Sequence, residues 1–137
     1  MVIGGGAVAE RKALGLINAN ADVTIISPTL TPALDAAKTD GRITHVKRRF
    51  RASDIDGAAI VVAATDDAKV NRSVARAAGD GVLLNIVDDP SLCTFIVPSV
   101  IRAGAFTIAI STGGASPSAA KAMRLKIEGA LGTGALK

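Results

Sequence analysis

The residues best suited to do chemistry stand near the start of the chain, where a short apolar run is followed by three glycines. Gly4 to Ala9 has the sequence Gly-Gly-Gly-Ala-Val-Ala, which fits Gly-x-Gly-x-x-Gly/Ala between a strand and a helix. The first glycine permits a tight turn, the second lets a pyrophosphate approach the backbone, and Ala9 keeps the helix close to the strand. Free N–H groups and the helix dipole attract the anion. The pattern predicts a dinucleotide site, and a glycine turn without a ligand is the alternative.

Recognition of the adenosine ribose depends on the residues after the next strand. An acidic residue is expected there, about twenty residues after the glycines. Ser27, Pro28 and Thr29 stand at that position instead, and Asp22 lies at the other end of the strand. The same loop contains no Arg to hold a 2′-phosphate. We therefore expect NAD and not NADP as the cofactor, with its ribose held by hydroxyl and backbone contacts.

Two pairs of charged residues have both a functional and a structural interpretation. Asp66 and Asp67 follow an apolar strand, where they could contact a cofactor, cap the next helix, or do both. Arg11 and Lys12 lie in the first turns of the glycine-loop helix, where the helix dipole disfavours cations. They either face solvent or contact a phosphate or substrate group.

Alternating strands and helices must position these residues. Strands are predicted at residues 2–3, 23–26, 43–50, 60–64 and 83–87. Helices are predicted at residues 8–19, at about 32–40, and from a cap at Thr65 or Asp66 to Gly79. These assignments rest on apolar spacing and on turn residues. Short connections between such elements imply right-handed crossovers and a doubly wound parallel sheet, which is an α/β fold.

The pattern changes after Pro98. Residues 106–110 are predicted to form a strand and residues 111–114 a polar glycine turn, and Ser116 followed by Pro117 is typical of a helix start. The apolar stripe of this last helix consists of Ala120, Met123, Ile127 and Leu131. Such a stripe must be covered by the sheet or by another subunit.

Composition limits the class of protein. The chain has 137 residues, 49% of them hydrophobic, and a net charge of +4, which suits one globular domain with an appendage. The apolar runs are too short to cross a membrane, no secretory leader is visible, and the one cysteine, Cys93, favours a reducing cytoplasm. The charge favours an acidic partner, but three Phe without Tyr or Trp offer no platform for nucleic-acid bases. His45 and Cys93 do not have metal-ligand spacing, so no resident metal is expected.

Five segments, in order along the chain, carry a resemblance to a known family. They are residues 4–12, 63–67 with 70–71, 85–90, Cys93 with 95, 96 and 98 less one inserted position, and 110–117. Each motif alone is weak, but together they cover nearly the whole chain and resemble the precorrin-2 dehydrogenase family, the N-terminal module of siroheme synthases. The family binds NAD on a Rossmann domain and oxidises precorrin-2 to sirohydrochlorin. Some members also insert ferrous iron to give siroheme.

The resemblance implies roles for individual residues. It places NAD contacts at Gly4, Gly6, Ala7, Val8, Pro28, Thr29, Thr65 and Asp66, and tetrapyrrole contacts at Ser111, Thr112 and Asn85. It assigns the catalytic carboxylate to Asp88 and not to Asp89. A carboxylate beside the nicotinamide could accept the proton that the substrate loses after hydride removal, or stabilise the cation. Without the family, an Asx turn into Pro90 would be the simplest explanation of these two residues.

The resemblance also implies a domain organisation and partners. Residues 1–97 would form the Rossmann-like NAD-binding domain, and residues 98–137 a small α+β dimerisation element that makes the chain a homodimer. Family members usually extend beyond both ends, so we expect this chain to be trimmed. Precorrin-2 is a polycarboxylate and ferrous iron is a second candidate substrate. Basic residues that could bind the carboxylates, or simply be solvated, are Lys47, Arg48, Arg49, Arg51, Arg102, Lys121 and Arg124.

Two other functions compete with this enzyme. The first is a dinucleotide-sensing Rossmann module that does no chemistry. Only the Asp88 segment and the loop at 111–117 separate it from the dehydrogenase. The second is a nucleic-acid-binding protein, which the basic balance allows but which lacks a recognisable reading helix.

Overall fold

The computed structural model describes residues 1–79, 81–87 and 89–132. The chain forms two compact units, Met1–Phe95 and Ile96–Lys137. The division falls between Phe95 and Ile96, close to the predicted boundary after residue 97.

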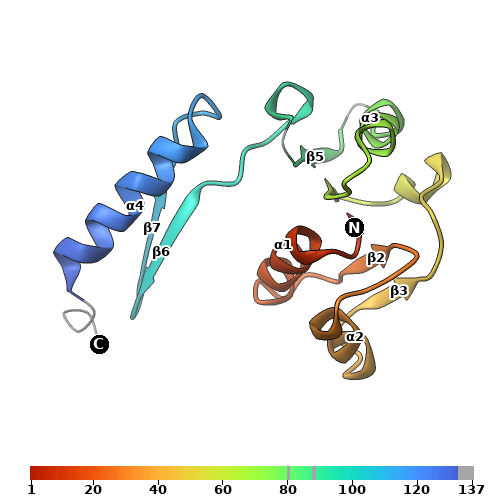
Figure 1. Ribbon diagram of the computed structural model, residues 1–137, viewed down its shortest axis with the longest axis horizontal. Helices are drawn as coiled ribbons and strands as arrows, with labels where there is room; N and C mark the ends of the chain where they lie inside the picture. The colour runs from red at the N-terminus through yellow and green to blue at the C-terminus, as the bar shows by residue number, and fades with distance from the viewer. Residues whose placement is uncertain (80, 88, 133–137) are drawn as a thin grey trace. The chain divides into compact units, whose positions relative to one another are not determined.

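The first unit is built on a five-stranded sheet. Its strands are β1 (Val2–Ile3), β2 (Thr24–Ile26), β3 (Thr44–Val46), β4 (Ile60–Ala63) and β5 (Leu83–Ile86). Their order in the sheet is β3-β2-β1-β4-β5, and every neighbouring pair is parallel; Figure 1 labels β2, β3 and β5 of this sheet. The chain runs outward from β1 to β3 and then returns to the other side of β1. The carboxyl ends of β1 and β4 therefore flank the switch point where sheets of this kind bind ligands. The predicted α/β class is confirmed.

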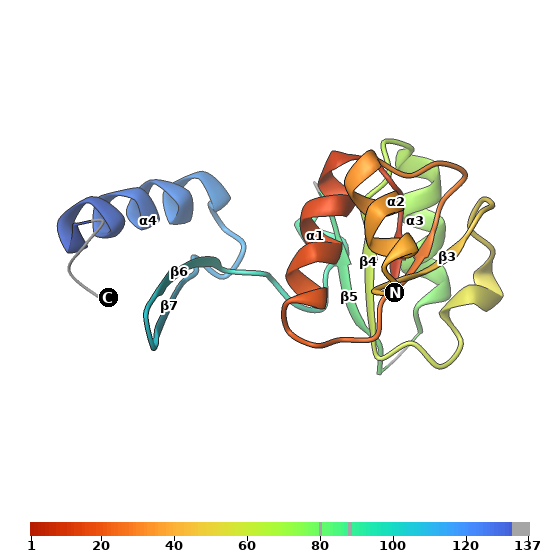
Figure 2. The same cartoon turned by 90° about the horizontal axis from the view of Figure 1, so that it is seen from below.

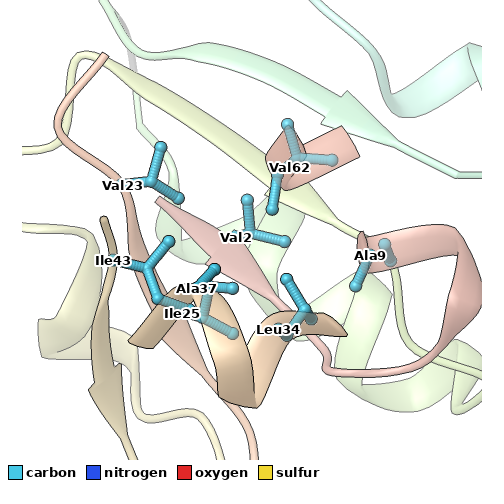
Figure 3. Packing of buried hydrophobic residues seen from close by; sticks show 10 residues of the cluster. Val2, Ala9, Val23, Ile25, Leu34, Ala37, Ile43 and Val62 are labelled. Atoms are coloured by element: carbon cyan, nitrogen blue, oxygen red, sulfur yellow. The ribbon is translucent and has the colours of Figure 1, made fainter. Parts of the chain in front are cut away.

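Helices cover both faces of this sheet. They are α1 (Ala7–Ile17), α2 (Pro32–Thr39) and α3 (Ala68–Ala77), with the short 3-10 turns η1 (Ala52–Ile55) and η2 (Pro90–Leu92). Successive strand residues point to opposite faces. Val2 packs with Ala9 of α1 and Leu34 of α2 (Figure 3), whereas Ile3 packs with Val74 of α3. Helices α1 and α3 consequently lie on opposite sides of the sheet (Figure 2).

Two local expectations in this unit are corrected. The predicted strand at 43–50 ends at Val46, because the Arg48 amide turns back to the Val46 carbonyl at 2.9 Å. The cap of α3 is Asp67, and neither Thr65 nor Asp66 takes that position. Its Oδ1 accepts hydrogen bonds from the amides of Lys69 at 2.8 Å and Val70 at 3.3 Å.

The second unit consists of a hairpin and a helix. Strands β6 (Ser99–Ala103) and β7 (Phe106–Ile110) pair antiparallel, and α4 (Pro117–Leu131) follows. The strand at 106–110 was predicted and β6 was not. Gly104, at φ +57°, supplies the positive φ that a two-residue hairpin turn needs. Ser116 caps α4 and Pro117 is its first residue, as the sequence predicts.

Candidate functional site

The glycine loop joins β1 to α1 at the switch point of the sheet. Gly4 has φ +116°, and a Cβ there would overlap the carbonyl oxygen of Ala64. A Cβ at Gly5 would overlap the carbonyl oxygen of Thr29. A Cβ at Gly6 would have no atom of the described residues within 4 Å. The first two glycines are therefore required by the packing of the protein itself, whereas the space at Gly6 is open. The dinucleotide pattern leaves the second position unrestricted and so does not show the requirement at Gly5.

The first turn of α1 presents its backbone to solvent. Gly6 is the N-cap, and within the described residues no side chain caps the helix. Gly6, Ala7 and Val8 are exposed, while Ala9 is fully buried against the sheet. The N–H groups of a first helical turn lack partners inside the helix and attract anions. This turn is suited to a pyrophosphate, and buried Ala9 has the packing role that the pattern assigns to it.

The two cations of α1 differ in environment. Arg11 is exposed and Lys12 is half-buried. Burial lowers the pKa of the Lys12 ammonium, Arg11 lowers it further, and the Cys93 thiol acts in the opposite direction. Lys12 is therefore the less solvated of the two cations.

The loop after β2 lies against the glycine loop. The Thr31 amide donates to the Gly5 carbonyl at 3.0 Å. The Ser27 hydroxyl is buried and donates to the Thr29 carbonyl at 2.7 Å, while the Ser27 carbonyl lies 2.9 Å from His45 Nε2. Pro28 and Thr29 are exposed beside the glycines. The predicted ribose contacts are thus brought to the glycine loop, and the Ser27 hydroxyl is used to hold their loop in shape.

A pocket of about 220 Å³ opens at the carboxyl ends of β4 and β5. Its lining residues are Thr65, Asp66, Ala68, Asn71, Arg72, Ile86, Val87, Asp89 and Leu92. It contains both predicted contacts after β4, and Arg72 is the one cation in this lining. Asn71 and Arg72 were given no role from the sequence. Asn71 belongs to one of the five segments that carry the family resemblance. Its contact with the loop after β4 depends on the fold and is not evident from the sequence.

The segment after β5 carries the predicted catalytic carboxylate. Asp88 lies outside the described residues. On one side of it, the Val87 amide donates to the Ala63 carbonyl at 2.9 Å. On the other side, Asp89 lines the pocket and accepts from the Ser91 hydroxyl at 2.6 Å. The Asp89 carboxylate thus accepts a hydrogen bond within its own turn. The assignment of the catalytic carboxylate to Asp88 and not to Asp89 stays a prediction.

Asn85 and Cys93 tie this segment back to β5. Asn85 is buried, and its Nδ2 donates to the Phe95 carbonyl at 3.2 Å. Cys93 Sγ accepts from the Ile86 amide at 3.2 Å. The substrate contact expected at Asn85 is not tested by this geometry, which shows its amide bonded within the protein.

The predicted tetrapyrrole contacts Ser111 and Thr112 lie in the second unit, in the exposed loop between β7 and α4. Ser111 Oγ accepts from the Gly113 amide at 3.1 Å, and Thr112 Oγ1 accepts from the Ser116 amide at 2.9 Å. Both hydroxyls border a hollow of about 120 Å³ within this unit. The Thr112 hydroxyl also fixes the start of α4, a role that either Ser or Thr can fill.

Some of the basic residues proposed for the substrate are engaged elsewhere. Arg48 forms two hydrogen bonds to the Asp54 carboxylate, at 2.5 and 2.8 Å, and these hold the pKa of Asp54 below its usual range. Arg124 pairs with Glu128 at 2.6 Å. For Arg48 and Arg124 the structural interpretation is therefore favoured. Lys47, Arg49 and Arg51 are exposed.

Comparison with known proteins places this geometry in a family. A family model described as "Putative NAD(P)-binding" matches residues 1–99. The chain belongs to this NAD(P)-binding family. It is 46% identical over 129 residues to a siroheme synthase of Methylobacillus flagellatus, which covers 93% of this chain and 28% of that protein. A siroheme synthase of Thioalkalivibrio sulfidiphilus is 44% identical over 129 residues, covering 93% of this chain and 26% of that protein. The chain thus spans little more than a quarter of these relatives.

A solved structure of SirC, a precorrin-2 dehydrogenase, is also similar to this NAD(P)-binding chain. It has a TM-score of 0.86 and 26% sequence identity, and the match covers 94% of this chain and 64% of that one. The resemblance predicted from the sequence is confirmed, and so is a nicotinamide dinucleotide as the cofactor.

The residues present fit such a cofactor. The open space at Gly6, the exposed first turn of α1 and the exposed loop at Pro28 and Thr29 adjoin one another at the edge of the sheet. Among the described residues, no group of three His, Cys, Asp or Glu side chains could hold a metal ion. None of the helices in that part of the chain has the length and hydropathy needed to cross a membrane.

Proposed function

We propose that this chain catalyses the NAD-dependent dehydrogenation of precorrin-2 to sirohydrochlorin. The observation that carries the proposal is the uncapped, exposed helix start behind the glycine loop, at the same sheet edge as the pocket between the ends of β4 and β5. The names of the similar proteins supply the substrate class. The absence of an Arg from residues 27–31 supports NAD over NADP.

Different residues along this edge of the sheet would contact different parts of the cofactor. The backbone at Gly4, Gly6, Ala7 and Val8 would hold the pyrophosphate. Pro28 and Thr29 would contact the adenosine ribose, and Thr65 and Asp66 the half of the cofactor nearer β4. The pocket beyond them is small compared with typical ligand sites of about 300–1,000 Å³. It would therefore receive the nicotinamide end or one edge of the substrate, with Arg72 facing a substrate carboxylate.

The reaction removes two electrons and two hydrogens from the substrate. When bound, NAD supplies the hydride acceptor. The substrate cation that remains must lose a proton, and we assign its acceptance to the Asp88 carboxylate, which comes two residues after the end of β5 in the sequence. Asp88 then releases the proton to solvent. Ser111, Thr112 and Asn85 would contact the tetrapyrrole.

Ferrous iron is a second candidate substrate, because some members of the resembling family insert it into sirohydrochlorin. Asp88 is the carboxylate we would expect to take part. The exposed apolar residues of α4 support a homodimer, and a single cysteine supports a reducing cytoplasm. Light scattering of the purified chain should give twice the monomer mass, and a monomer alone would contradict the dimer.

Variants of the two neighbouring aspartates test the assignment. Under anaerobic conditions, Asp88→Ala should lose at least about 100-fold in turnover of precorrin-2, in the range of general acid–base effects. It should bind NADH nearly as the wild type does. Asp89→Asn is the control: it keeps the size of this pocket-lining side chain and should lose much less turnover than Asp88→Ala. Wild-type turnover by Asp88→Ala would remove this residue from the mechanism, and tight NADH binding without any turnover by the wild type would favour the sensor.

A further inference from the structure

Asn71 makes an unusually complete set of contacts with one residue of the loop after β4. It lies on the first turn of α3 and is 8% exposed. Its Oδ1 accepts from the Thr65 hydroxyl at 2.7 Å and from the Thr65 amide at 3.4 Å, and its Nδ2 donates to the Thr65 carbonyl at 3.1 Å. The side chain thus bonds the N–H, the C=O and the hydroxyl of the same residue.

Thr65 needs such a partner because it lies beyond the last paired residue of β4, Ala63. Backbone groups that leave a sheet lose the ladder that satisfied them, and leaving them unpaired near the protein interior is unfavourable. A side-chain amide carries one carbonyl and one N–H group in fixed geometry, as a peptide group does. Asn71 therefore supplies the hydrogen bonds that a neighbouring strand would otherwise make with the backbone of Thr65.

The other side of this loop is the glycine loop. A Cβ at Gly4 would overlap the Ala64 carbonyl oxygen and lie 3.3 Å from the Thr65 amide nitrogen. The Ala64–Thr65 peptide is consequently held between Gly4 on one side and Asn71 on the other. Helix capping does not explain Asn71, because Asp67 already caps α3.

We propose that Asn71 is a positioning residue for the dinucleotide. It holds Thr65 and Asp66 in the conformation that receives the cofactor, and its polar atoms do not bind the cofactor because they are bonded to Thr65. This inference rests on the dinucleotide site of the proposed function and adds a residue to it. Arg72, the next residue, is exposed in the pocket and has no such contacts with Thr65 within the described residues.

The test compares two substitutions on the same helix. Asn71→Ala removes the three side-chain hydrogen bonds from Asn71 to Thr65. Val74→Ala removes a fully buried apolar side chain that lies outside the proposed binding site. NADH binding to the free chain, measured by NADH fluorescence, should weaken about tenfold in Asn71→Ala, as expected for the loss of one to two hydrogen bonds. In Val74→Ala it should change less than about twofold, although that variant loses at least as much stability in urea.

Asn71→Asp keeps an acceptor for the Thr65 amide and hydroxyl, but it removes the donor to the Thr65 carbonyl and places a negative charge at a buried position, so it gives a second variant that breaks the carbonyl contact. Hydrogen exchange should quicken at residues 64–67 in both Asn71 variants and should not do so selectively in Val74→Ala. Equal NADH affinities in Asn71→Ala and Val74→Ala would overturn the inference and leave the dehydrogenase intact. Failure of the wild type to bind NADH would instead contradict the proposed function.

Discussion

The two units of this chain differ in how completely they bury their apolar residues. In the first unit, buried side chains from β1, β2, β4, β5 and the three helices form two clusters, one on each face of the sheet. Among the described residues of the second unit, only Ile101 and Ala120 are buried. Phe106, Met123 and Leu125 are 62%, 49% and 53% exposed. The first unit has the core of an independent domain, whereas the second leaves large apolar side chains exposed.

The proposed cofactor site in the first unit and the proposed tetrapyrrole contacts in the second unit differ in the same way. The glycine loop and the pocket after β4 rest on rigid, buried elements, which favours binding in a fixed geometry. The loop at Ser111 and Thr112 is exposed and is held by two hydrogen bonds to its own backbone. The proposed cofactor contacts therefore lie in the unit with the buried core, whereas the proposed tetrapyrrole contacts Ser111 and Thr112 lie in the unit that is mostly exposed.

The largest expected difference between the units is in their response to truncation of a leucine. Leu34 is fully buried between α2 and the sheet, so Leu34→Ala should destabilise the chain by about 2–5 kcal/mol. Leu125→Ala should change the stability of the monomer by less than about 0.5 kcal/mol. Urea unfolding followed by circular dichroism measures both. A similar loss from the two substitutions would show that the second unit is packed as tightly as the first.

A smaller difference is expected at two glycines with positive φ. A Cβ at Gly4 would strike the backbone of Ala64, whereas a Cβ at Gly114, at φ +89°, would lie 3.3 Å from the flexible end of Ile96. Gly4→Ala should therefore cost at least about 1–3 kcal/mol and weaken NADH binding sharply. Gly114→Ala should cost about 1–2 kcal/mol from its backbone conformation alone and leave NADH binding unchanged. Equal NADH affinities in the two variants would contradict a rigid glycine loop.

The smallest effect concerns ion pairs. The Arg48 guanidinium holds the pKa of Asp54 below its usual range, so this pair stabilises the fold above the unfolded carboxyl pKa of about 3.9. That stabilisation is lost as the pH falls through the lower folded pKa. Asp54→Asn should remove this part of the acid dependence of unfolding. In the second unit, Glu128→Gln breaks a pair within α4 alone and should leave the stability of the first unit unchanged. An unaltered acid limb in Asp54→Asn would mean that the pair contributes nothing.

Much of the first unit could be predicted from the sequence, because its decisive signals are local. The apolar runs that became β1, β4 and β5 are bounded by glycine or polar residues, and the glycine loop has a fixed spacing. The predictions failed where a contact between residues several positions apart along the chain determines the local structure. Strand β3 ends early where Arg48 turns toward Asp54. The role of Asn71 depends on a loop six residues before it.

Two further differences have local causes that the sequence leaves ambiguous. Thr65, Asp66 and Asp67 are all good helix caps, and only the path of the chain out of β4 selects Asp67. Strand β6 follows Pro98 and is half-exposed, so its apolar alternation is weak, although Gly104 marked the turn that pairs it with β7. The carboxylate assigned to catalysis comes from the family resemblance, because two adjacent aspartates before a proline are equally consistent with a turn.

Coupling of cofactor reduction to tetrapyrrole oxidation is the central property of the proposed enzyme. Anaerobic mixing of the wild-type chain with precorrin-2 and NAD should yield NADH and the absorption spectrum of sirohydrochlorin in equal amounts, with much slower reduction of NADP. Because the chain contains no Trp, NADH emission reports the product with little background. Repeating the reaction with ferrous iron shows whether siroheme follows. The expected result is one NADH for each sirohydrochlorin. NADH binding with no sirohydrochlorin formed would contradict the dehydrogenase and leave a dinucleotide-binding module.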